Sequence, residues 1–414
     1  MRWPHALRSL QHRNLRLFFA GQCVSLVGTW MQSVAQGWLV YRLTHSTRLL
    51  GLVGFLAQIP VFLLGVWAGS LADRLPRKRI ILATQLNALA QATLLATLTL
   101  TGVVRAWMLL PLALMLGLTY AFEIPARQSL LGDIAGEDMP NALALNSTVV
   151  NGARALGPAM AGWLVAAVGE GVCFGLNAVS FLGTIYAVAV MRVPPPRPHS
   201  GSRRGHLLDG LAYAGRTPAV RALLALLAAS SFFALPYVTF LPVFARDVLH
   251  GDARLLGLLQ GSAGLGALTA GVLLMVRQGL RGLGRRVGIG ATLLGVGLGG
   301  LSLSRTAPLS CAFLFLAGSG YLTQTAGTMT LLQVLAPAGM RGRVMGLFSM
   351  LFVGMTPFGA LAGGVVAGRF GVPQVVRWGA AVVLLASVVF HAALPGLRRT
   401  VRAHQPARSA PRVP

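Results

Sequence analysis

The sequence predicts an all-α polytopic membrane protein with twelve transmembrane helices, arranged as two pseudo-symmetric six-helix bundles. Three observations predict this class. Of the 414 residues, 55% are hydrophobic and only 11% are charged, whereas soluble domains carry about 25% charged residues. Apolar runs of about 20 residues, long enough to cross a bilayer, recur along the chain. Lys and Arg gather in alternate connections between these runs. A soluble or disordered protein is therefore excluded.

The first half contains six apolar runs, of which the fifth is the most polar. They cover residues 17–41, 49–72, 80–101, 106–126, 143–167 and 172–191. A stretch rich in Pro, Gly, Ser and Arg follows and is typical of a polar linker. We therefore expect an N-terminal six-helix bundle at 1–192 and a cytoplasmic linker at 193–217.

The second half contains six more runs, which predict a C-terminal six-helix bundle at 218–396. They cover residues 219–244, 255–276, 287–304, 307–333, 344–367 and 373–395. The halves also share a weak repeat at an offset of 202 residues, which relates the glycine-rich stretch 157–169 to 359–371. Residues 397–414 form a basic, proline-containing cytoplasmic tail that we expect to be disordered and to lie along anionic lipid.

The distribution of Lys and Arg predicts that both termini are cytoplasmic. With this orientation, 26 basic residues lie on the inner side and 8 on the outer side, and Arg154 lies within a span. Adding or losing one span would spoil this asymmetry, which follows the positive-inside rule. We expect a multi-pass protein of a bacterial-type cytoplasmic (inner) membrane.

Composition also excludes several functions. The net charge of +26 comes mainly from the connections, so we expect no nucleic-acid partner. The only lysine, Lys78, lies between two arginines, so the Gly-Lys-Ser/Thr phosphate loop of ATPases is absent. Cys23, Cys173 and Cys311 have no metal-ligand spacing. We expect no cofactor, no metal site, no catalytic cluster and no cleaved signal peptide.

A basic loop follows the second run and begins with Gly69. It continues with the charged residues Asp73, Arg74, Arg77, Lys78 and Arg79. This loop resembles the signature loop of the major facilitator superfamily, although Pro76 replaces a glycine. The resemblance implies a cytoplasmic gate in which Asp73 contacts the start of the eleventh helix, where a carboxylate is favoured. Arg127, Arg341 and Arg343 would join this gate. The alternative is simple positive-inside charge.

The fifth run carries small residues and a proline at Gly152, Gly157, Pro158 and Gly162. This pattern resembles the glycine-proline element of antiporter members of the superfamily. Small residues let helices pack closely and proline permits bending, so the resemblance implies a hinge. The alternative is generic close packing, and Ala161 replaces one glycine of the family pattern.

The N-terminal part of the sequence narrows the resemblance to one group within the superfamily. Arg13-Asn14-Leu-Arg16 leads into Ala20-Gly21-Gln22, Gly28-Thr-Trp30 and Ala35-Gln36-Gly-Trp38, and Ala126-Arg127-Gln128 follows later. These residues are similar to the start of the group that contains the enterobactin exporter and macrolide-efflux proteins, the transmembrane secretion effectors. The group implies a transporter that moves small molecules by alternating access, with a monomer as the usual state.

The first run has a polar stripe at helical spacing, with steps of three and four residues. Its members are Gln22, Ser25, Thr29, Gln32 and Gln36. Polar side chains rarely face lipid, so this face lines a cavity or contacts another helix. We expect cavity lining, and add Asn151, Tyr321, Gln324 and Thr328 from the fifth and tenth runs. Structural hydrogen bonds between helices are the alternative.

Two charges lie inside spans. Arg154 falls near the membrane midplane, where a charge is costly and usually functional. It either pairs structurally or binds an anionic group of the substrate. Glu123 lies near the inner end of the fourth span, four residues before Arg127. It either forms an interfacial ion pair with Arg127 or carries protons together with Arg154.

No acidic residue lies in the middle of the first, seventh, eighth, tenth or eleventh run. The cavity is therefore expected to be polar, neutral and locally positive, which favours neutral or anionic cargo. We interpret the chain as a secondary exporter of a small amphiphilic molecule, siderophore- or drug-like, in exchange for protons. It would not be an enzyme. The alternatives are an importer or facilitator on the same fold and a non-transporting membrane scaffold or sensor.

Overall fold

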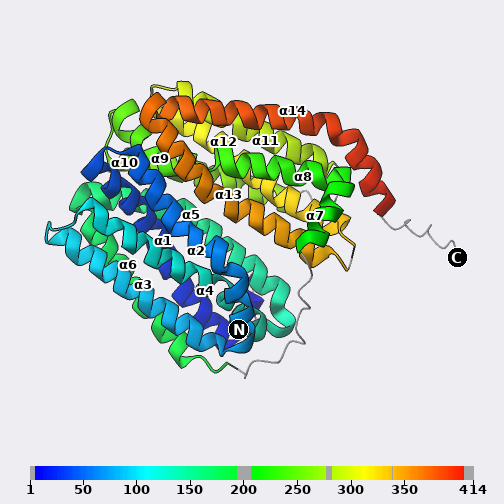
Figure 1. The fold of residues 1–414 in the computed structure, drawn as a ribbon. Coiled ribbons are helices and arrows are strands. Elements are labelled where there is room, and N and C mark those ends of the chain that lie inside the picture. Colours follow the sequence, from blue (N-terminus) through cyan, green and yellow to red (C-terminus); the bar gives the residue numbers. More distant parts are fainter. Residues whose placement is uncertain (1–4, 194–206, 277–281, 338, 405–414) are drawn as a thin grey trace.

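The computed structural model describes residues 5–193, 207–276, 282–337 and 339–404 and is shown in Figure 1. The chain forms two helical bundles that lie side by side, coloured blue to green and green to red. The N-terminal bundle consists of α1 (Arg13–Thr44), α2 (Thr47–Arg74), α3 (Arg77–Leu100), α4 (Leu109–Ala135), α5 (Met139–Val168) and α6 (Glu170–Val190), with short 3₁₀ turns at His5–Gln11, Ala106–Met108 and Gly136–Asp138. The predicted all-α fold is confirmed for the described residues.

The C-terminal bundle begins after a short helix, α7 (Leu207–Arg216), which lies in the predicted linker. It consists of α8 (Pro218–Ala229), α9 (Tyr237–Val243), α10 (Ala253–Val276), α11 (Leu283–Leu303), α12 (Ala307–Leu335), α13 (Arg341–Phe370) and α14 (Val372–His404). The predicted seventh span is interrupted by π-helical turns at Ser230–Ala234 and Phe244–Val248. Pro236 and Pro242 explain the irregularity, because proline cannot donate a backbone hydrogen bond.

Nine segments of the described chain are long and apolar enough to cross a membrane, and one of them, Ala106–Val168, contains both α4 and α5. Among the long helices, α1 and α12 fall outside this set. α1 carries the polar stripe of the first run, and α12 carries the predicted cavity residues Tyr321, Gln324 and Thr328 of the tenth run; these polar residues lower the mean hydropathy of both helices. With them, the described helices are consistent with twelve spans.

The expectation of a disordered tail is wrong for its first residues. α14 continues to His404 instead of ending near residue 395. The residues after Gly396 include Leu, Arg and Ala, which are good helix formers, and the stretch to His404 contains no further glycine or proline. The remainder of the predicted tail, 405–414, lies outside the described residues.

α7 packs on the C-terminal bundle. Its Tyr213 hydroxyl donates a hydrogen bond of 2.9 Å to the carbonyl oxygen of Leu335 at the end of α12. Its Asp209 forms an ion pair of 3.2 Å with Arg343 in the first turn of α13. The last residues of the predicted linker therefore form a docked helix.

The two bundles meet along two pairs of helices, α2 with α13 and α5 with α10. Each pair crosses where two glycines come together. A Cβ on Gly51 would lie 3.1 Å from the Cα of Gly364, and a Cβ on Gly162 would lie 2.8 Å from the Cα of Gly257. The repeat offset of 202 residues relates Gly162 to Gly364. The weak sequence repeat therefore falls on the positions at which the halves approach most closely.

Candidate functional site: a central cavity between the two bundles

The halves are in contact at one end of the molecule, where α1 ends and α2 begins; we call this the closed end. Here the Thr47 hydroxyl donates a hydrogen bond of 3.0 Å to the carbonyl oxygen of Gly364. The Tyr41 hydroxyl hydrogen-bonds the carboxylate of Asp247, which links α1 to the end of the irregular seventh span. Close glycine packing and these hydrogen bonds leave little space between the halves at this end.

The halves diverge toward the opposite end, where α2 ends and α3 begins; we call this the open end. The contact between α2 and α13 continues as far as Phe62, whose ring lies against Gly354. Beyond it, a Cβ placed on Gly69 of α2 or on Gly346 of α13 would meet no atom within 4 Å. Gly152, on the corresponding part of α5, is equally free. The space between the bundles therefore opens toward this end.

A cavity of about 680 Å³ lies between the bundles. This volume is in the range of sites that bind drug-sized molecules. Helices of both bundles contribute to its wall. Its polar and aromatic lining includes Gln22, Ser25, Thr29, Trp30, Ser33, Gln36, Gln58, Gln85, Tyr120, Glu123, Arg127, Arg154, Tyr237, Thr239, Gln260, Tyr321, Phe352 and Thr356.

Six of the ten side chains predicted to line the cavity lie at its wall. They are Gln22, Ser25, Thr29, Gln36, Arg154 and Tyr321. Asn151, Gln32, Gln324 and Thr328 lie elsewhere, which corrects the prediction for these four. Asn151 donates a hydrogen bond of 2.8 Å to the carbonyl oxygen of Ser147 on its own helix. That the six residues bind a substrate stays a prediction.

Gln32 and Gln324 instead join the helices within each bundle. Gln32 donates a hydrogen bond of 2.9 Å to Gln91 of α3 and accepts one of 2.8 Å from Asn177 of α6. Gln324 donates a hydrogen bond of 2.7 Å to the Ser230 hydroxyl, and Thr328 is fully buried one turn away. The alternative explanation of the polar stripes, structural hydrogen bonding, therefore applies to part of each stripe.

Arg154 lies near the middle of α5 and beside the indole of Trp30. The guanidinium carbon is 5.1 Å from the centre of the ring, a distance at which a cation is attracted to an aromatic face. No carboxylate of the described residues forms an ion pair with Arg154, and its Nε has no hydrogen-bond partner among them. The cavity therefore contains a positive charge that no carboxylate in the described part of the chain neutralises.

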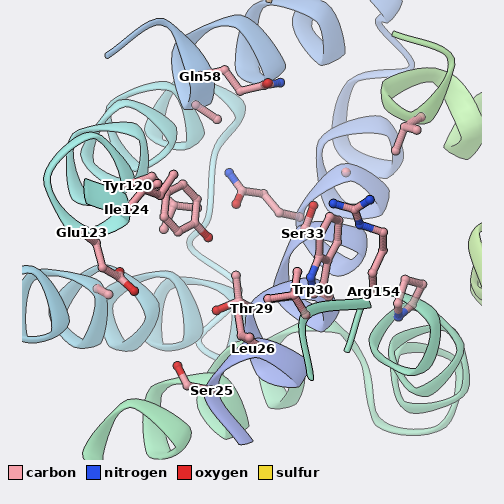
Figure 2. Close-up of a pocket in the computed structure, with 18 of the residues that line it drawn as sticks. Ser25, Leu26, Thr29, Trp30, Ser33, Gln58, Tyr120, Glu123, Ile124 and Arg154 are labelled. Carbon is pink, nitrogen blue, oxygen red and sulfur yellow. The ribbon is translucent and has the colours of Figure 1, made fainter. Parts of the chain in front are cut away.

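Glu123 is the one carboxylate at the cavity wall within the described part of the chain. It is buried and lies 3.2 Å from Arg127, one turn further along α4. The Gln85 side chain of α3 lies beside it at the cavity wall. Figure 2 shows Tyr120 and Glu123 approaching α1 from one side, and Arg154 lying beside Trp30 on the other.

The cavity wall of the C-terminal bundle carries no Asp, Glu, Lys or Arg in the described residues. Its polar groups are Tyr237, Thr239, Gln260, Tyr321 and Thr356. The rings of Tyr321, Phe352 and Phe348 are stacked with interplanar angles of 13°. All cavity charges therefore lie on the N-terminal bundle, opposite a neutral and partly aromatic wall.

The predicted gate residues separate into several groups. Arg77 is buried in an ion pair with Asp133 at the end of α4, and Lys78 donates hydrogen bonds to the last carbonyl oxygens around the end of α6. Both contacts stay within the N-terminal bundle, whereas Arg127 lines the cavity. Arg74, Arg79 and Arg341 are exposed, and Gly69 faces open space. The side chain of Asp73 lies outside the described residues, so its predicted contact with the eleventh helix stays a prediction.

The predicted hinge residues lie in a continuous helix. A Cβ on Gly157 would lie 2.6 Å from the Cβ of Trp30, so this glycine lets α5 approach α1. Gly162 contacts α10, Pro158 is buried, and Gly152 contacts nothing. Gly157 and Gly162 are thus close-packing positions, and bending at Pro158 stays a prediction.

Sequence reasoning missed several polar side chains at the cavity, including Gln58, Gln85, Tyr120, Tyr237 and Gln260. Tyr120 lies three residues before Glu123, and Gln85 lies among other polar residues of its run, whereas Gln58 has no polar residue near it in its apolar run. An isolated polar residue inside a span is itself a sign of a functional or packed position, and this was the available signal.

Comparison with known proteins places the chain in a family. The family described as transmembrane secretion effector matches residues 5–410. The chain is 25% identical to a staphyloferrin A transporter of Staphylococcus aureus, covering 86% of this chain and 90% of that protein. It is 29% identical to the enterobactin exporter EntS of Citrobacter koseri, covering 82% and 81%. Its fold matches an inward-facing bacterial homologue of the iron transporter ferroportin, with a TM-score of 0.68 at 20% identity, over 92% of this chain and 98% of that one.

Proposed function

Because the chain belongs to the transmembrane secretion effector family, a group of multi-pass membrane transporters in the major facilitator superfamily, we propose that it exports a small amphiphilic molecule in exchange for protons. The cargo is neutral or anionic, and the membrane is the bacterial inner membrane. The observation that carries this proposal is Arg154, which pairs with no carboxylate of the described residues, in a cavity whose other two charged side chains there, Glu123 and Arg127, pair with each other.

The charged side chains of the cavity support a neutral or anionic cargo. A guanidinium can bind a carboxylate or phosphate with two parallel hydrogen bonds. An organic cation would meet Arg154 and Arg127, and Glu123 is the one carboxylate among the described lining residues that offsets them. Placing like charges next to each other at a binding interface costs on the order of several kcal/mol, and we expect a similar cost for an organic cation in this cavity. An anion with an aromatic or apolar part would gain from both walls of the cavity.

The orientation follows from the asymmetry of basic residues, which supports a cytoplasmic open end. In this orientation the structure is the state that loads cargo from the cytoplasm. Rocking of the halves would open the Tyr41–Asp247 contact and the glycine crossings, and would close the open end. Outward movement is supported by the name of the enterobactin exporter and by the glycine-proline element of α5.

Glu123 is our candidate proton carrier, because it is the carboxylate at the cavity wall in the described part of the chain, and alternating access would open this cavity to each side in turn. It takes up a proton from outside when the cavity faces outward. It releases the proton to the cytoplasm when the cavity faces inward, and its carboxylate then pairs with Arg127. The 3.2 Å contact between the two side chains is the arrangement expected after release.

Glu123→Gln is therefore expected to remove the dependence of transport on the pH gradient. Everted membrane vesicles would be incubated with an extract of the native host, and compounds that enter only in the presence of the protein would be quantified by mass spectrometry. An acidic vesicle interior should increase uptake by the wild type at least about tenfold relative to vesicles without a gradient. The variant should lose this increase but keep gradient-independent exchange. An undiminished gradient effect in the variant would show that another group carries the proton.

A further inference from the structure

Helices α3 and α6 of the N-terminal bundle form one part of the cavity wall, and we call this part of the cavity the side lobe. The lobe is bounded by Gln22 of α1, Gln85 and Ala88 of α3, Glu123 of α4, and Phe181 and Thr184 of α6. α3 and α6 do not take part in either contact between the two halves, which is made by α2, α5, α10 and α13. A lobe that reaches α3 and α6 therefore lies away from the path along which the halves separate.

Two amides in this lobe lack partners. Gln22 is 4% exposed, and neither its Nε2 nor its Oε1 has a hydrogen-bond partner among the described residues. Gln85 is 3% exposed, and its Oε1 is likewise without a partner, although the side chain contacts Glu123. Buried polar groups in native proteins are almost always hydrogen-bonded, so an unpartnered one at a cavity wall indicates a ligand contact.

Gln32 shows that the bundle provides hydrogen-bond partners for a buried amide that has a structural role. It is ten residues further along α1, is equally buried, and hydrogen-bonds both α3 and α6. Gln22 lines the cavity together with residues of α3 and α6 and has neither hydrogen bond. The difference between two glutamines of one helix is hard to explain by packing alone.

We propose that the side lobe is a second subsite for the cargo and binds a neutral amide or hydroxyl group, while Arg154 binds an anionic group of the same molecule. Gln22 offers its Nε2 group as a donor and its Oε1 as an acceptor, and Gln85 offers its Oε1 as a second acceptor. A ligand amide has the matching groups, a carbonyl oxygen that accepts and N–H groups that donate. This inference rests on the proposed export of an anionic amphiphile and specifies its chemistry.

The distance between the two subsites also sets the length of the cargo molecule. Trp30, which contacts Arg154, lies eight residues after Gln22 on α1, a separation of about 12 Å at 1.5 Å per residue. The cargo is therefore an elongated molecule, with its charge at one end and its neutral polar group at the other. Its middle part would pass Ser25 and Leu26 at the cavity wall.

The test uses decanedioic acid monoamide, a ten-carbon chain with a carboxylate at one end and an amide at the other, and decanoate, which lacks the amide. Binding to the purified full-length protein in lipid nanodiscs is measured by calorimetry. The amide should improve affinity for the wild type about three- to tenfold, the effect of one net hydrogen bond. The advantage should disappear in Gln22→Leu, and Arg154→Ala should weaken binding of both probes.

The outcomes separate the two proposals. If decanoate binds through Arg154 but the amide brings no advantage, or the same advantage in Gln22→Leu, the side lobe is not a cargo subsite and the proposed function stands. If neither probe binds the wild type, the anionic amphiphile itself is contradicted, and the subsite with it.

Thermal unfolding supplies a control that needs no ligand. Gln22→Leu removes a group without partners and should leave the melting temperature unchanged or raise it. Gln32→Leu removes two hydrogen bonds from the same helix and should lower it. A decrease in Gln22→Leu equal to that in Gln32→Leu would assign Gln22 to the fold and overturn the inference.

Discussion

Replacing Arg154 with alanine is expected to lower export of an anionic cargo about ten- to 150-fold, while the protein still reaches the membrane. The range corresponds to the net value of hydrogen bonds to a charged group. No carboxylate partner in the described part of the chain would be left unpaired by the substitution, so its effect on stability should be small. Export is measured by mass spectrometry of the medium, and the amount of protein by immunoblot of membranes.

Two further variants make this result specific. Arg154→Lys keeps the charge but loses the planar group above Trp30, so it should restore part of the export. Arg369→Ala removes an exposed arginine near the closed end, away from the cavity, and should leave export unchanged. Normal export of the anion by Arg154→Ala would exclude Arg154 from the binding site.

Gly51→Val is expected to abolish transport by preventing the closed end from forming. A Cβ at this position would lie 2.5 Å from the carbonyl oxygen of Ala360 and 3.1 Å from the Cα of Gly364. Both are backbone atoms, which cannot move aside as a side chain can. Overpacking of this kind costs about 1–3 kcal/mol, so the state open toward the cytoplasm should lose population about five- to 150-fold.

The loss of the state open toward the cytoplasm can be observed with a cysteine in place of Gly346, which faces open space at the open end. In everted vesicles, a membrane-impermeant maleimide should label Gly346→Cys readily in the wild-type background and slowly in the Gly51→Val background. Gly65→Val is the matched control. Gly65 lies on the same helix as Gly51, but a Cβ placed on it would meet no atom within 4 Å. Wild-type transport by Gly51→Val would show that the closed end does not need this glycine contact.

The fold was predictable because the membrane constrains the chain strongly. Apolar runs of the required length and the distribution of arginine were enough for the class and for the approximate helix positions. The irregular seventh span was not predicted. Pro236 and Pro242 are visible in the sequence, but they do not by themselves show that the helix continues through π-helical turns while it packs against α13 and α14.

The cavity was predictable only in part, for a physical reason. A polar stripe on a helix shows that the side chains avoid lipid, but not whether they meet a cavity or another protein group. Gln22 and Gln32 belong to one stripe of α1, yet only Gln32 finds partners, because Gln91 and Asn177 happen to lie opposite it. The lobe beside α3 and α6 depends on such three-dimensional neighbours, and the sequence around Gln85 does not show that this side chain lines the cavity.

The proposed export of an anionic or neutral amphiphile is tested most directly by comparing metabolites in its native host with and without the gene. Spent medium and cell extracts would be compared by mass spectrometry, with the gene restored on a plasmid as control. We predict that deletion causes at least one elongated amphiphilic compound, neutral or anionic, to accumulate in the cells and to fall in the medium. A compound that instead disappears from the cells and remains in the medium would contradict export and show import.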